Sequence, residues 1–158
     1  MTPLVKSLLW FSAIGCGLMA GLYFAFSTFI LQAFDRLGPA PAAQAMNAIN
    51  VQIVRSLFMP LFLGTTLTSA ALAVIGLTRP GTPGAATMLA GGAIYVIGMF
   101  VVTMAFNVPL NNALAAASGA DVAAAWPHYV QRWLLWNHIR TLASTLGCAL
   151  FVVAIATG

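Results

Sequence analysis

Charged residues are scarce in this sequence, and their scarcity decides its class. Only 5% of the 158 residues are charged, glutamate is absent, and aspartate occurs twice. A soluble domain carries about 25% charged residues, because it cannot otherwise cover its surface. With 61% hydrophobic residues and a mean hydropathy of +0.98, the composition predicts an integral membrane protein.

The few basic residues exclude one class of partner. The net charge of +4 comes from six Lys and Arg residues that are spread along the chain without forming a block. Nucleic-acid binding usually relies on a clustered basic patch. The sequence pI of about 9.7 therefore does not indicate nucleic-acid binding.

Metal ligands and redox cysteines are also few. Cys16 and Cys148 lie in separate apolar segments without a CxxC spacing, which is typical of small buried residues. His128 and His138 are ten residues apart, which on one helix separates them by about 80° and nearly three turns. A joint metal site would need a kink at Pro127 or a second subunit to bring them together. No metal and no cofactor is predicted, and a single haem ligand remains the alternative.

Common catalytic constellations are missing as well. The sequence has no Ser/His/Asp set, no paired carboxylates, no glycine-rich phosphate loop and no acidic residue in an apolar segment that would suit a proton relay. Neutral polar groups, aromatic rings and one or two arginines are what remains for chemistry.

Four charge-free runs locate the membrane spans: residues 7–34, 56–78, 80–120 and 141–158. About 20 apolar residues cross a bilayer as a helix, so each run supplies one span. The first run is too long for the apolar core of a signal peptide and is expected to stay as a helix. The prediction is a single all-α domain, residues 1–158, that forms an integral membrane four-helix bundle with spans at about 8–31, 56–77, 88–106 and 139–157.

A long helix is expected around the second span. Pro39 and Pro41 break the first helix, and apolar residues then repeat at helical spacing without a stop signal into the second span. We therefore predict one helix from about Pro41 to Leu77, bent at Pro60 and extending beyond the membrane. The fourth span is expected to extend beyond the membrane on the same face, with Pro127 either kinking its helix or opening it at the first turn.

Polar residues are expected to converge at one end of the bundle. Four consecutive spans place residues 32–55 and 107–140 on the same side of the membrane. In the first span, Tyr23 and Ser27 lie one turn apart and are expected to form hydrogen bonds within the bundle. A helix turns about 100° per residue, which places six residues of the stretch 126–144 on one stripe: Tyr129, Trp133, Trp136, Asn137, Arg140 and Ser144. This convergence predicts a cavity lined by aromatic and asparagine side chains.

The predicted substrate pocket consists of Asn50, Asn107, Asn111, Trp133, Trp136, Asn137 and Arg140. Tryptophan rings can stack on a flat aromatic ligand, amides can form hydrogen bonds with its oxygens, and an arginine can stabilise an enolate or phenolate. The alternative is structural, because Trp and Tyr favour membrane interfaces and an arginine there often only anchors the helix.

Four segments resemble the anthrone oxygenase family, whose bacterial members mostly carry only a domain of unknown function: GLYFAFSTFI at 21–30, MNAIN at 46–50, NVPLNN at 107–112 and RWLLWNHIR at 132–140. The resemblance implies a small four-helix membrane protein. From the characterised fungal members it also implies oxidation of an anthrone to an anthraquinone, with molecular oxygen as co-substrate and no established metal or flavin.

A cofactor-free oxidation, as the resemblance implies it, needs a base and a site for an enolate. The base would remove a proton from the activated carbon of the substrate. Tyr129 lies on the stripe, whereas His138 carries the side chain better suited to proton transfer near neutral pH but has a different helical phase. The residues that would hold the enolate oxygen are Arg140, Asn107, Asn111 and Asn137.

The leading interpretation is a membrane oxidoreductase that oxidises a hydrophobic polycyclic or quinone-like substrate with molecular oxygen. One alternative is a membrane protein that binds or passes on a hydrophobic aromatic ligand without transforming it, and another is a structural bundle that contacts a partner. The expected partners are the lipid bilayer and an aromatic small molecule, and glycine-rich faces in spans one and three leave a homodimer open. The expected location is the bacterial cytoplasmic (inner) membrane.

Overall fold

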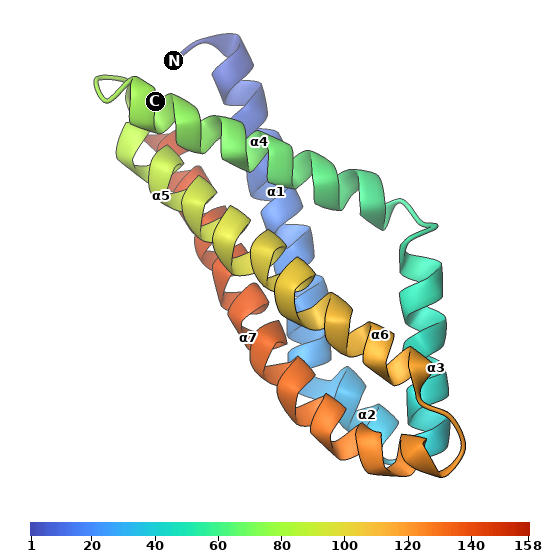
Figure 1. Ribbon diagram of the computed structural model, residues 1–158. Coiled ribbons are helices and arrows are strands. Elements are labelled where there is room, and N and C mark those ends of the chain that lie inside the picture. The colour runs from blue at the N-terminus through green and yellow to red at the C-terminus, as the bar shows by residue number, and fades with distance from the viewer.

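The computed structural model describes the backbone of residues 1–158 and every side chain except that of Ala120. Its core is four long helical rods (Figure 1). Each rod is long and apolar enough to cross a membrane: Pro3–Asp35, Phe58–Thr78, Ala85–Ala116 and Asp121–Ala156. The prediction of an all-α membrane bundle with four spans is therefore confirmed.

Two of the rods are composite. The first consists of α1 (Pro3–Ala25), a π-helical segment (Phe26–Ile30) and α2 (Leu31–Asp35). The third consists of α5 (Ala85–Tyr95), two π-helical segments (Val96–Val101 and Thr103–Asn107) and α6 (Val108–Ala116). The remaining helices are α3 (Pro39–Ile53), α4 (Phe58–Thr78) and α7 (Ala120–Ala156).

The long helix α7 holds the bundle together. It packs against α1 and α5 within the spans and against α3 and α6 at its N-terminal end. One buried cluster lies among the spans, around Leu9, Leu72 and Phe151. A second lies where α2, α3, α6 and the start of α7 meet, at the lower end of Figure 1, around Met46 and Trp126. The first and third connections therefore share one end of the molecule, as their order predicts.

The helix predicted from Pro41 to Leu77 is wrong, because α3 ends at Ile53 and α4 begins at Phe58. Ser56 makes the break: its hydroxyl donates to the Ile53 carbonyl at 2.8 Å and accepts from the Phe58 amide at 3.1 Å. Pro60 lies in the first turn of α4, where its missing N–H costs nothing. The second span thus does not extend beyond the membrane as one helix.

The fourth span does extend as one helix, since α7 has 37 residues. Pro127 lies inside it, seven residues after its first residue. The alternative that Pro127 opens the helix is therefore wrong.

Glycines allow the spans to approach each other closely. A Cβ atom at Gly92 of α5 would overlap the Ser69 carbonyl oxygen of α4, and one at Gly98 would overlap Ala143 of α7. Contacts between small residues of this kind drive helix association in membranes. Because these glycines face neighbouring helices of the same chain, their presence does not require a second subunit. The homodimer stays a prediction.

We expect Gly92→Ala to destabilise the bundle by about 1–3 kcal/mol, because the added methyl group must displace α4. Gly21→Ala is the matched control on α1, where an added Cβ would have no atom within 4 Å. That variant should be neutral or stabilising by up to about 1 kcal/mol, since alanine favours helices over glycine. Thermal unfolding of both variants in detergent measures the difference, and equal effects would show that the close approach of α4 and α5 does not limit stability.

Candidate functional site

A cavity of about 330 Å³ lies between α1, α3, α4, α7 and the third rod. Most of its wall is apolar, with side chains such as Phe26, Met46 and Phe62. Small-molecule sites in proteins typically have volumes of about 300–1,000 Å³. The polar or polar-edged residues that line the cavity are Tyr23, Asn50, Thr103, Asn111, Asn112, Trp133 and Arg140.

Arg140 is the cation of this cavity, and it is only 5% exposed. Its Nη2 donates to Asn137 Oδ1 at 2.7 Å and its Nη1 to Thr103 Oγ1 at 3.4 Å. Its guanidinium carbon lies 4.3 Å from the ring centroid of Tyr23 and 5.0 Å from that of Trp133. Two aromatic faces and neutral oxygens therefore surround the positive charge.

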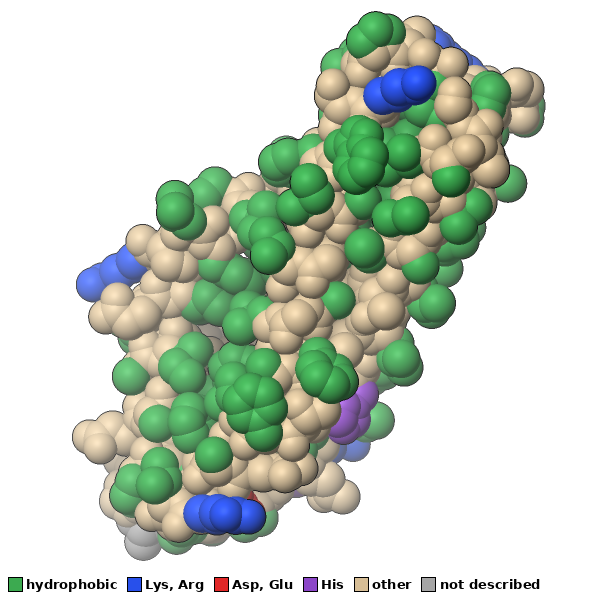
Figure 2. Space-filling view, turned by 180° about the vertical axis from the view of Figure 1, so that it is seen from behind, with side chains coloured by type: hydrophobic (Ala, Val, Ile, Leu, Met, Phe, Trp, Pro, Cys, Tyr) green, Lys and Arg blue, Asp and Glu red, His purple; other side chains and the backbone are tan. Residues whose placement is uncertain are grey.

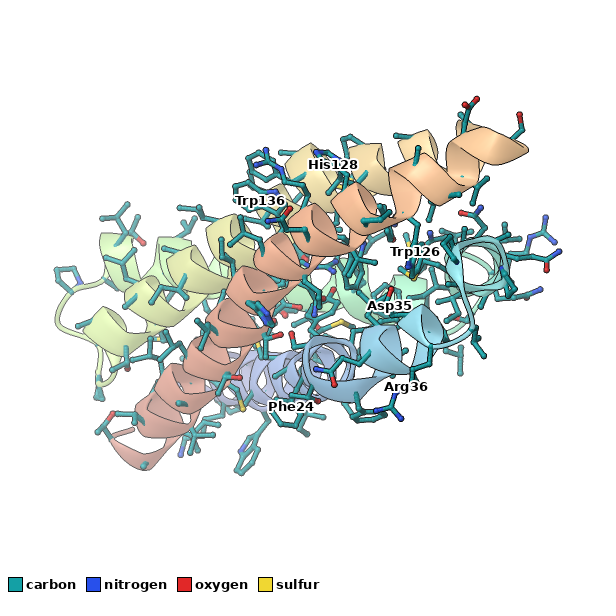
Figure 3. All side chains as sticks on the ribbon, turned by 90° about the horizontal axis from the view of Figure 1, so that it is seen from below. Phe24, Asp35, Arg36, Trp126, His128 and Trp136 are labelled. Carbon is teal, nitrogen blue, oxygen red and sulfur yellow. The ribbon has the colours of Figure 1, made fainter. Side chains whose placement is uncertain are left out.

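The acidic residues of the chain lie elsewhere. Asp35 is exposed on α2, where its Oδ1 accepts from Trp126 Nε1 at 2.9 Å, a pair visible in Figure 3. Asp121, the second of the two acidic residues, is exposed in the first turn of α7. Each hydrogen-bond partner of Arg140 is neutral. A buried cation held in this way is costly within a membrane, which makes the cavity beside it a candidate site for stabilising an anion.

Asn137 positions Arg140 rather than lining the cavity. Its side chain is fully buried, and its Nδ2 donates at 2.8 Å both to the Tyr23 carbonyl and to Ser27 Oγ. Tyr23 and Ser27 flank the start of the first π-helical segment, a type of irregularity that is frequent at functional sites. With both amide protons bound to the first rod, the Asn137 oxygen is fixed in place to accept from Arg140.

A second group of hydrogen bonds joins α3, α6 and α7 around Asn111. Its Oδ1 accepts from Tyr129 Oη and from Trp133 Nε1, both at 2.9 Å. Its Nδ2 donates to Asn50 Oδ1 at 3.1 Å. The indole of Trp133 is thus held at its nitrogen by Asn111, while its face lies beside Arg140.

The structure brings four of the seven predicted pocket residues to the cavity wall: Asn50, Asn111, Trp133 and Arg140. Asn137 and Asn107 are buried behind the wall, and Asn107 Nδ2 donates to the Trp133 carbonyl at 3.3 Å. Trp136 lies on the outer side of α7 (Figure 3), stacked on Phe106 with ring centroids 3.6 Å apart. The functional roles of all seven stay predictions.

The two candidate bases do not line the cavity. Tyr129 is buried, and its hydroxyl is bound to Asn111. His138 is exposed, with Nδ1 3.0 Å from Ser27 Oγ. Within the described residues no three His, Cys, Asp or Glu side chains are grouped as a metal site would require.

Tyr23 and Thr103 are cavity residues that the sequence did not single out as such. Their position depends on how the first and third rods face α7, which helical periodicity within one span does not give. The spacing of Tyr23 and Ser27 was a partial signal, because it placed two polar side chains on one face of an apolar span.

Comparison with known proteins gives one match. The family model described as anthrone oxygenase matches residues 50–150. No curated protein and no solved structure shows significant similarity to the chain. The matched range contains Asn50, Asn111, Trp133 and Arg140 of the cavity, whereas Tyr23 lies before it.

We expect Asn111→Leu to destabilise the protein by about 2–4 kcal/mol, because it leaves the hydroxyl of Tyr129, the indole N–H of Trp133 and the amide oxygen of Asn50 without their partner. The matched control is Asn112→Leu, at the exposed neighbouring position, which should change stability by about 0.5 kcal/mol or less. Thermal unfolding in detergent compares the two. A control as destabilised as Asn111→Leu would indicate a general intolerance of leucine on α6.

Proposed function

Because the chain belongs to the anthrone oxygenase family, we propose that it is a membrane oxidoreductase that oxidises a hydrophobic polycyclic or quinone-like substrate with molecular oxygen. The cavity beside Arg140 is the proposed site, and the bacterial cytoplasmic membrane is the proposed location. The observation that carries the proposal is the buried guanidinium, which has only neutral partners at the wall of an otherwise apolar cavity.

The cavity suits a flat aromatic substrate with one acidic oxygen. Its apolar walls replace water around the rings, and Phe26 and Trp133, whose ring centroids are 5.5 Å apart, offer aromatic edges and faces. An oxygen that becomes negative during the reaction is stabilised most by a fixed charge in a site without water. Arg140 supplies that charge, and the orientation of its guanidinium is fixed by Asn137.

The oxidation balances without a reductant. An anthrone loses a proton from its methylene carbon, and the resulting enolate oxygen lies against Arg140. The carbon then gives electrons to molecular oxygen and forms a carbon–oxygen bond, and the peroxide anion takes up a proton. Loss of water from this hydroperoxide, with the second hydrogen of the same carbon, leaves a ketone. One oxygen atom stays in the product and the other leaves as water.

Tyr23 is the proposed proton acceptor, because besides Arg140 it is the ionisable side chain on the cavity wall. Tyr23 must itself lose a proton before it can accept one; its burial opposes this, whereas the guanidinium of Arg140 over its ring would stabilise the tyrosinate. The hydroxyl contacts Met99 Sδ at 3.6 Å, a weak partner that leaves it available to a ligand. Tyr129 and His138 would each need a shift of the structure to reach a substrate in the cavity.

The second candidate function is binding of such a molecule without its transformation. One observation favours it: no carboxylate, imidazole or thiol belongs to the described lining of the cavity. A protein that only sequesters or passes on an aromatic molecule needs no base.

We expect the purified protein to consume oxygen with anthrone faster than the uncatalysed reaction does, and to keep this activity in the presence of a metal chelator. Arg140→Leu should lower kcat/KM by roughly a hundredfold or more, because it removes the charge that stabilises the enolate. Arg140→Lys should retain part of the activity. Arg132→Leu is the control, since Arg132 is exposed on the same helix and does not line the cavity.

Oxygen uptake no faster than background would reject the oxidation of anthrone. If anthrone still raises the unfolding temperature of the wild-type protein but not that of Arg140→Leu, the binding function is supported instead. If it raises neither, the site does not bind anthrone and both functions fail for this ligand.

We expect Tyr23→Phe to lower kcat by about a hundredfold with little change in KM, since it removes the proton acceptor and leaves the cavity shape intact. The matched control is Tyr95→Phe. Tyr95 is also buried, but its hydroxyl has no hydrogen-bond partner and it does not line the cavity. This variant should keep wild-type kcat. Equal kcat for Tyr23→Phe and the wild type, measured by oxygen uptake, would reject Tyr23 as the base.

A further inference from the structure

The cavity is walled by buried side chains on α7 and by exposed ones on the turn after α3 and on the third rod. Trp133 and Arg140, on its α7 side, are 4% and 5% exposed. Val54 and Met104, which also line it, are 58% and 51% exposed. These two residues lie on the turn between α3 and α4 and on the π-helical segment before α6. They form the mouth of the cavity. Figure 2 shows a hollow rimmed by hydrophobic side chains beside α3, on the face of the molecule that is turned away from the viewer in Figure 1.

At the end of the bundle where α2 and α3 lie, the described side chains form a buried cluster rather than an opening. There Leu114, Trp126 and Tyr129 are at most 3% exposed and form one buried cluster. The indole of Trp126 is fixed to α2 by its hydrogen bond with Asp35. A ligand moving along the bundle axis from water would have to displace this cluster, whereas the mouth needs no such rearrangement.

The mouth lies at the depth where acyl chains meet headgroups. The 21 residues of α4 give a rod of about 32 Å, close to the 30 Å of a hydrocarbon layer. Phe58 and Met59, in the first turn of α4, line the cavity and therefore lie at the edge of that layer. Met104 belongs to the third span, Ala85–Ala116.

The surface around the mouth has an apolar side and a polar side. Leu57 and Val101 are exposed by 86% and 47%. At this depth such side chains contact acyl chains. Arg55 and Asn112 are exposed on the other side, where they reach the headgroup region. A neutral aromatic molecule that carries an oxygen concentrates at the same depth, with its rings in the lipid and its oxygen toward water.

We infer that the cavity takes its ligand sideways from the bilayer through the mouth between Val54 and Met104, and that an apolar extension of the ligand remains among the acyl chains. The volume of about 330 Å³ is at the lower end of the range for ligand sites. The oxygen-bearing rings fill it beside Arg140, and a longer molecule extends out of the mouth. The inference rests on the proposed function only in assuming that an aromatic ligand occupies the cavity.

A removable plug tests this route on folded protein. The variant Met104→Cys, in a chain that also carries Cys16→Ala and Cys148→Ala, is labelled with a bulky thiosulfonate reagent that a reducing agent removes. We expect the label to lower kcat/KM for anthrone by about tenfold or more, as overpacking a site does, and its removal to restore the unlabelled value. Leu146→Cys in the same chain is the control, because Leu146 on α7 is also 51% exposed but does not line the cavity.

A second readout does not require turnover. In lipid nanodiscs a naphthoquinone with a long alkyl chain is expected to quench the fluorescence of Trp133. The Trp133 signal is obtained by subtracting the fluorescence of Trp133→Phe from that of the protein with Trp133 in place. The label on the Met104→Cys variant should abolish this quenching, and the label on the Leu146→Cys variant should not. A naphthoquinone without the alkyl chain should bind no more tightly than the one that carries it, since the chain stays outside the cavity.

The outcomes separate the route from the proposed function. If the labelled Met104→Cys variant keeps full turnover and full quenching, the lateral route is wrong. If quenching is blocked by the label but no variant consumes oxygen above background, the route stands and the oxidation fails. If the naphthoquinone with a chain does not quench Trp133 although the one without it does, the apolar extension has no exit and the inference is overturned.

Discussion

The site depends on a positive charge that the chain keeps inside the membrane without an acidic partner. An isolated charge at membrane depth costs several kcal/mol, and Arg140 offsets this cost only through Asn137, Thr103 and two aromatic faces. The neighbouring contacts maintain this arrangement. Asn137 is fixed to α1, and Trp133 is fixed by Asn111. An anionic oxygen in the cavity would lower the cost of the buried charge, and the surrounding contacts keep the guanidinium oriented for it.

Hydrogen bonds of α7 also determine how the rods assemble. Inside a bilayer the hydrophobic effect does not bring helices together, so close packing and polar contacts determine their register. Asn137 joins α7 to α1, Asn107 joins the third rod to α7, and Asn111 joins α6 to both α3 and α7. The same side chains thus stabilise the bundle and shape the cavity, which is why stability and activity must be measured together in variants of these asparagines.

The architecture could be predicted from the sequence because charge-free length and chain order determine the spans and the side on which connections meet. The stripe on α7 correctly placed Trp133, Asn137 and Arg140 on one buried face, because that helix is continuous. Periodicity gives only the direction of a side chain and not its neighbour. The side chain of Trp136 points about 60° away from that of Trp133 around the axis of α7. This is enough to bring Trp136 against Phe106 on the outer side of the helix. The break at Ser56 depends on one side-chain cap within an apolar pattern. The place of Tyr23 depends on how the first rod faces α7, which periodicity within one span does not give.

The position of Arg140 relative to the mouth suits a reaction that creates charge inside the protein. A neutral aromatic molecule dissolves in the acyl chains at little cost, whereas its enolate would have to be removed from water at a cost of several kcal/mol. On the proposed route the substrate passes Val54 and Met104 while neutral and is ionised only beside the guanidinium. The charge of Arg140 would then favour the anion over the neutral molecule that entered, and such a difference in binding is what accelerates a reaction.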